Sequence, residues 1–128
     1  MGTGDLGEFQ VAGKTLFSMG LVKESEGNLS AFDGRRLRIT RTGSKLAELG
    51  EGDVVEGTLD QIPENASSDA ELHIAMYREH GPGAVAHDHV PGSVPEGWAE
   101  GEPHGRYAFG ATLEEAVGML VDAVRGSS

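Results

Sequence analysis

The sequence predicts a mixed α/β layer fold with a mainly antiparallel central sheet that is covered by helices. Two segments, residues 8–19 and 113–124, carry apolar side chains at helical spacing. Two short β-like runs, residues 28–32 and 36–40, flank Asp33-Gly34, a dipeptide that favours a tight hairpin. Short strands joined by hairpins need helices to bury them, so the helices are expected to lie against the faces of the sheet.

Local signals in the sequence predict where the remaining elements lie and where two of the helices begin. Capping-box patterns at 68–71 and 112–115 open the second and third helices. Proline and glycine make residues 90–103 a loop. The other expected elements are a turn or short helix at 45–49, strands at 53–59, 84–89 and 106–109, and a helix at 69–79.

The composition describes a single acidic domain. The chain has 128 residues, the size of one domain, and 21 acidic against 10 basic residues give a net charge of −11. A surface of that sign repels nucleic acid and anionic lipid, so neither is expected as a partner. No apolar stretch approaches the roughly 20 residues of a membrane span, and the N-terminal residues lack a secretory signal. We therefore expect a cytoplasmic protein.

Three histidines form a candidate metal site. Cysteine is absent, so any metal must be held by His, Asp or Glu. His87 and His89 lie two residues apart on a predicted strand and point the same way, and a turn-rich loop can bring His104 back to them. Three imidazoles with an open position are an arrangement that catalytic zinc uses. The alternative is a pair of ordinary exposed histidines, because the His-x-His spacing alone is a weak motif.

The start of the second helix is a candidate anion site. Ser67 and Ser68 begin this helix, where N–H groups and the positive end of the helix dipole favour an anion. Ser68 is also expected to cap the helix, with or without a ligand. His73 shares a helix face with Asp69 and is interpreted as half of an ordinary surface pair.

Five motifs, in chain order, resemble those of the class II aldolase and adducin head family, which contains fuculose-phosphate and ribulose-phosphate aldolases and epimerases. An ordered set of five that covers nearly the whole chain is far more specific than any single motif. The motifs are Gly27–Ser30 (family G-N-x-S), Ile39–Gly43 (I-T-x-S/T-G), Ala66–Asp69 with His73 and Tyr77 (S-S-E-x-x-x-H), Ala84–His89 (A-V-V-H-x-H), and Pro103–Gly105 followed by Gly110 and Thr112–Ala116 (N-H-G, then G-x-S/T-x-x-E-A).

The resemblance implies a compact three-layer fold in which residues 1–128 form one class II aldolase-like domain. It implies zinc or another divalent metal on His87, His89 and His104. The residues that it implies for the phosphate of a small phosphorylated substrate are Gly27, Asn28, Thr42, Gly43, Ser67 and Ser68. Asn28 and Thr42 could also be turn residues and nothing more.

The implied activity is that of an aldolase-like lyase acting on a small phosphorylated sugar or ketose. The chain departs from the family at two places: residues 90–103 replace a long segment, and Asp69 stands where the family has its catalytic Glu. Asp69 is thus the candidate catalytic carboxylate, and turnover is expected to be weak. The alternative is a non-catalytic binding or assembly module, like adducin heads. The family builds its site between subunits of a ring, which implies a cyclic homo-oligomer, with a tetramer as the first expectation.

Overall fold

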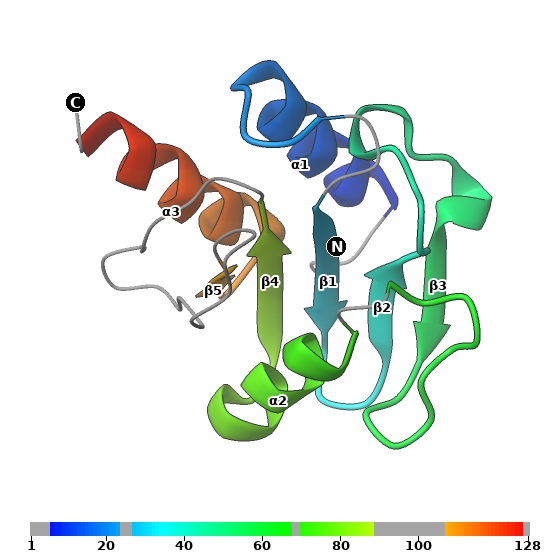
Figure 1. Cartoon of the computed structure of the whole chain (residues 1–128). Coiled ribbons are helices and arrows are strands. Elements are labelled where there is room, and N and C mark those ends of the chain that lie inside the picture. Colours follow the sequence, from blue (N-terminus) through cyan, green and yellow to red (C-terminus); the bar gives the residue numbers. More distant parts are fainter. Residues whose placement is uncertain (1–5, 24–26, 68–69, 89–106, 127–128) are drawn as a thin grey trace.

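The protein folds into three layers, with a five-stranded sheet between helices (Figure 1). A computed structural model describes residues 6–23, 27–67, 70–88 and 107–126. The elements are α1 (Leu6–Ser18), β1 (Asn28–Phe32), β2 (Leu37–Thr40), the 3-10 turns η1 (Leu46–Glu48) and η2 (Glu51–Asp53), β3 (Val54–Gly57), α2 (Ala70–His80), β4 (Gly83–His87), β5 (Tyr107–Gly110) and α3 (Leu113–Gly126).

The strands lie in the order β3-β2-β1-β4-β5, and every neighbouring pair is antiparallel. The predicted mainly antiparallel sheet with covering helices is therefore confirmed. The central pairing joins β1 to β4, with Asn28 opposite His87 and Phe32 opposite Gly83. This pairing connects the N-terminal hairpin to a strand more than fifty residues later, and it positions the candidate site.

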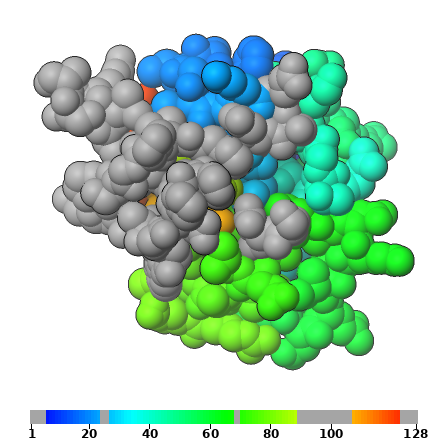
Figure 2. All heavy atoms as spheres, viewed as in Figure 1, coloured from blue at the N-terminus to red at the C-terminus, as the bar shows by residue number. Residues whose placement is uncertain are grey.

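The two faces of the sheet bury different helices. Helices α1 and α3 cover one face, where Leu29 and Ala31 of β1 join their core. Helix α2 covers the opposite face, where Phe32 packs with Ile74 and Tyr77. Figure 2 shows α2 along the lower part of the molecule, with the segment from β2 to β3 at the right. Because strand side chains alternate, Asn28 and Ser30 must face α2, on the same side as Phe32.

The predicted hairpin forms, with a longer loop than expected. Phe32 pairs with Leu37, so residues 33–36 form the connection and β2 begins one residue later than predicted. The Asp33 carboxylate accepts hydrogen bonds from the backbone N–H groups of Arg35 and Arg36 at 2.9 and 2.8 Å. These bonds lower the pKa of Asp33 and hold the chain in a turn at Arg36, which prevents that residue from joining the strand.

The cap of α3 differs in one bond from the predicted capping box. The Thr112 hydroxyl accepts the Glu115 N–H at 3.1 Å, as expected for an N-cap. The Glu115 carboxylate accepts the N–H of Ala111, at 3.1 Å, rather than that of Thr112. The capping box predicted at 68–71 involves Ser68, which lies outside the described residues, and it stays a prediction. Within the described part of the chain, no helix has the length and apolar character needed to cross a bilayer.

Candidate functional site

The antiparallel pairing brings several predicted site residues to one end of the sheet. β1 begins at this end and β4 finishes there, since Asn28 pairs with His87. β5 also begins there, because Tyr107 pairs with His87 on its other side. Gly27 directly precedes β1. Residues that are about sixty positions apart in the sequence thus meet where these strands begin or finish. We call this end of the sheet the site end.

The turn after β2 reaches the same end and carries the segment before α2 with it. Arg41 forms an isolated bridge with Ala66, the Thr42 N–H donates to the Asn65 carbonyl at 2.9 Å, and the Ser67 N–H donates to the Thr40 carbonyl at 3.0 Å. Thr42 is exposed, while Ser67 is buried. The two segments predicted to hold a phosphate are therefore joined by backbone hydrogen bonds.

Two glycines at this end have backbone conformations that disfavour a side chain. Gly27 has φ of +80° and Gly43 has φ of +78°. A Cβ atom on Gly27 would lie 2.7 Å from the His87 carbonyl oxygen and 2.7 Å from Cγ1 of Val22, whereas a Cβ on Gly43 would meet nothing within 4 Å. Gly27 is thus required by both conformation and space, and Gly43 by conformation alone.

We expect Gly27→Ala to destabilise the protein by about 2–4 kcal/mol and Gly43→Ala by about 1 kcal/mol. Both variants carry the cost of a positive φ, and only Gly27→Ala also forces apart β4 and the Val22 side chain. Urea unfolding of the two variants beside the unsubstituted protein measures the difference. Equal losses of stability in the two variants would show that Gly27 does not lie as close to β4 as the structure places it.

The structure places one of the three candidate metal ligands. His87 is 3% exposed, and its ring stacks on Tyr107 with centroids 4.0 Å apart and an interplanar angle of 16°. His89 and His104 lie outside the described residues, as do Ser68 and Asp69. Among the residues that are described, no three His, Asp or Glu side chains lie close enough together to hold a metal. The ligand set and the catalytic carboxylate remain predictions.

His73 is buried at the centre of this end, which corrects its assignment to a surface pair. Its exposure is 0%, and its Nε2 contacts Oδ1 of Asn28. Its Nδ1 lies 2.6 Å from the Ser30 hydroxyl, which lies 2.7 Å from the hydroxyl of Tyr77. The sequence does contain a signal for this burial. Ala70, His73, Ile74 and Tyr77 follow helical i, i+3, i+4, i+7 spacing, which makes His73 part of the face of α2 that packs on the sheet.

Burial controls the protonation of this polar cluster. Removal from water lowers the pKa of His73 to about 3, and the nearby His87 acts in the same direction. Burial likewise raises the pKa of Tyr77 well above its ordinary value of 10, against the opposing effect of its bond with Ser30. At neutral pH both groups are uncharged, so they act through directed hydrogen bonds.

Comparison with known proteins identifies the family. A sequence model of the class II aldolase and adducin N-terminal domain matches residues 8–96. The chain belongs to this family. A search of curated proteins gave no significant match.

Solved structures agree with this class II aldolase and adducin domain in fold. L-fuculose-1-phosphate aldolase from Thermus thermophilus superimposes with a TM-score of 0.78 at 22% identity, over 95% of this chain and 91% of that one. Another L-fuculose 1-phosphate aldolase gives 0.75 at 20%, over 97% and 84%. The enzyme of that name from Glaciozyma antarctica gives 0.69 at 12%, over 95% and 71%. At these identities the likeness establishes the three-layer fold.

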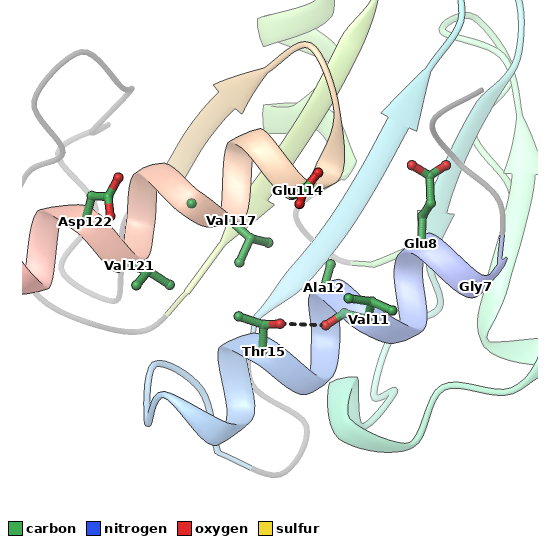
Figure 3. A pocket seen from close by; sticks show the side chains of 10 residues that line it. Gly7, Glu8, Val11, Ala12, Thr15, Glu114, Val117, Val121 and Asp122 are labelled. Carbon is green, nitrogen blue, oxygen red and sulfur yellow. Dashed lines mark hydrogen bonds between the residues drawn. The ribbon is translucent and has the colours of Figure 1, made fainter. Parts of the chain in front are cut away.

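A pocket of about 550 Å³ lies elsewhere on this class II aldolase and adducin domain, between α1 and α3. Figure 3 shows Val11 of α1 and Val117 and Val121 of α3 around it, with the carboxylates of Glu114 and Asp122 beside them. None of the described site residues lines this pocket. It is separate from the site end, because α1 and α3 cover the face of the sheet opposite α2.

Proposed function

We propose that this protein is a cytoplasmic, divalent-metal-dependent lyase that cleaves a carbon–carbon bond in a small phosphorylated sugar or ketose. In this proposal residues 1–128 form a single catalytic domain. The observation that carries it is the pairing of Asn28 with His87, because it puts a candidate phosphate ligand and a candidate metal ligand at one sheet end. Membership of the class II aldolase and adducin family supports the same activity.

In the proposed site, the phosphate binds where the turn after β2 meets the segment before α2. The side chains of Asn28, Thr42, Ser67 and Ser68 supply polar groups, and Gly27 and Gly43 let the backbone approach an anion closely. Helix α2 begins at Ala70, two residues after Ser68, so its first N–H groups and its dipole favour the same charge. The backbone bonds between the two segments support this arrangement, because they hold Thr42 and Ser67 in place before any ligand arrives.

His87, His89 and His104 are the residues that would hold the metal. His87 fits this role by its position, since it ends β4 beside Asn28, and three imidazoles are a donor set that suits zinc. A bound zinc or similar ion would supply Lewis-acid stabilisation of carbonyl and enediolate oxygens. The carboxylate of Asp69, one residue before α2, would move the proton, while the polar groups at the phosphate hold the substrate in position.

Metal content of protein purified without a histidine tag tests this proposal. We expect close to one zinc-like ion per chain, lost in His87→Ala and His89→Ala. His80→Ala is a matched control, because His80 is partly exposed at the far end of α2 and pairs with Glu79. Metal-free protein whose melting curve is unchanged by the first two substitutions would overturn the metal site and favour a non-catalytic, adducin-head-like module.

We also propose a cyclic homo-oligomer, with a tetramer as the first expectation. The net charge of −11 makes neighbouring subunits repel one another at low ionic strength, and salt screens this repulsion. Light scattering at increasing salt should therefore show a mass near four chains in molar salt. A strict monomer at high protein concentration in molar salt would refute the oligomer.

A further inference from the structure

Four buried polar side chains form a continuous row of hydrogen bonds between α2 and β1. The row runs from Tyr77 to Ser30, from Ser30 to His73, and from His73 to Asn28. Ser30 and His73 are 0% exposed, Tyr77 2% and Asn28 4%. This row of hydrogen bonds contains no ion pair, and it ends at Asn28, at the site end of the sheet.

With the Asn28 amide oxygen as the atom that meets His73, the chemistry of the groups gives the direction of the other bonds. The amide oxygen of Asn28 can only accept, so Nε2 of His73 must carry the proton. A buried neutral imidazole has one N–H, which leaves Nδ1 as the acceptor of the Ser30 hydroxyl. The Ser30 oxygen in turn accepts from the Tyr77 hydroxyl, and the Tyr77 oxygen is bonded to the backbone of Val85. The row is thus anchored on β4 and directed towards Asn28.

This direction determines which half of the Asn28 amide meets other partners. If the amide alone flipped, its NH₂ group would face the Nε2–H of His73, donor against donor, inside a buried cluster. The oxygen is therefore held by His73, and the amide nitrogen is turned away from it. An anionic oxygen is stabilised by N–H donors and repelled by an amide oxygen. The correct orientation of Asn28 is a condition for its use as a phosphate ligand.

We propose that His73 is a positioning residue that fixes the Asn28 amide with its N–H groups, and not its oxygen, towards an anionic oxygen of the substrate. This inference rests on the proposed function, because it assigns Asn28 to the phosphate. Ser30 and Tyr77 support His73 by holding it in the tautomer with the proton on Nε2. His73 itself does not touch the substrate.

A matched pair of substitutions distinguishes the roles of the two ring nitrogens of His73. The amide nitrogen of Gln can replace Nε2, so His73→Gln keeps a donor for Asn28. The shorter Asn reaches only as far as Nδ1, so His73→Asn keeps a partner for Ser30 and loses the one for Asn28. Both variants bury one neutral amide in place of an imidazole, so we expect similar losses of stability. A purely structural role of His73 would affect both in the same way.

The experiment is calorimetric titration of the metal-loaded protein with dihydroxyacetone phosphate, at a temperature where near-UV circular dichroism shows every variant folded. We expect His73→Gln to bind within about threefold of the unsubstituted protein, and His73→Asn to bind about tenfold more weakly or worse. In an Asn28→Ala background, His73→Asn should have no further effect on affinity, because the residue it positions is gone.

A measurement on the unsubstituted protein keeps the inference testable if a variant does not fold. The ¹⁵N shifts of the His73 ring should show the proton on Nε2, and the Asn28 side-chain NH₂ signals should shift on titration with dihydroxyacetone phosphate. A proton on Nδ1, or equal affinities of the two His73 variants in a protein that binds the ligand, would overturn the positioning role and leave the proposed function standing. No binding by the unsubstituted protein would overturn both.

Discussion

Lowering the pH from 6.5 towards 3 should weaken folding by up to about 5 kcal/mol through His73 alone. In the unfolded chain the histidine pKa is about 6.5, and in the folded protein burial lowers it to about 3. Between these values the unfolded state binds one more proton than the folded state. Stability therefore falls as the pH falls through this window, by about 1.4 kcal/mol for each pH unit, and this contribution is flat above it.

Urea unfolding of metal-free protein at pH 7 and pH 5 measures the effect. Over this interval His73 should account for a loss of about 2 kcal/mol that is absent in His73→Gln. The carboxylates of Asp33 and Asp53 do not interfere, because hydrogen bonds from neighbouring groups lower their pKa below the ordinary value of 3.8, which itself lies below this pH interval. The other histidines are present in both proteins. The same loss in both proteins would contradict the burial of a neutral His73.

Asp69→Glu should raise the rate of aldol cleavage by up to about 100-fold. By resemblance, Asp69 stands where the family has its proton-transferring Glu, and it is one methylene shorter. A general base must come within about 2.6–3.2 Å of the proton that it removes, and the missing bond withdraws the carboxylate by more than about 1 Å. The shorter side chain of Asp69 should weaken metal and phosphate binding less than it slows turnover. Cleavage of a phosphorylated ketose, followed as release of dihydroxyacetone phosphate, measures the rate.

Two further variants show whether a change in the cleavage rate comes from the carboxylate of Asp69. Asp60→Glu is the matched control, because Asp60 is an exposed carboxylate paired with Arg78 at 3.0 Å, and it should leave the rate unchanged. Asp69→Asn should remove the remaining activity. Brisk turnover by the unsubstituted protein, together with an unchanged rate in Asp69→Asn, would show that another group is the base.

Local signals in the sequence were sufficient to predict the order of the elements. β1 covers the predicted residues 28–32, and in α3 the predicted apolar face is buried at Leu113, Ala116 and Leu120. These elements depend on periodicity and capping, which neighbouring residues determine. The ends of β2 and β3 were less predictable, because hydrogen bonds of the turns, such as those to Asp33, compete with the sheet.

The buried polar part of the site could not be predicted in the same way. All five residues of β1 are buried, so its sequence lacks the alternation that marks a one-sided strand, and Asn28 and Ser30 resemble turn residues by type. Their partners, His73 and Tyr77, lie more than forty positions away. The stacking of His87 on Tyr107 likewise depends on the pairing of β4 with β5. Such contacts follow from the tertiary fold, and only the spacing along α2 hints at them.

We propose that one end of the sheet binds a metal and a phosphorylated substrate together. The most direct test is the rate at which a chelator removes the metal, with and without saturating dihydroxyacetone phosphate. We predict clear protection by dihydroxyacetone phosphate, less by inorganic phosphate, and loss of the protection in Asn28→Ala. Removal of the metal at the same rate with and without dihydroxyacetone phosphate would contradict the claim.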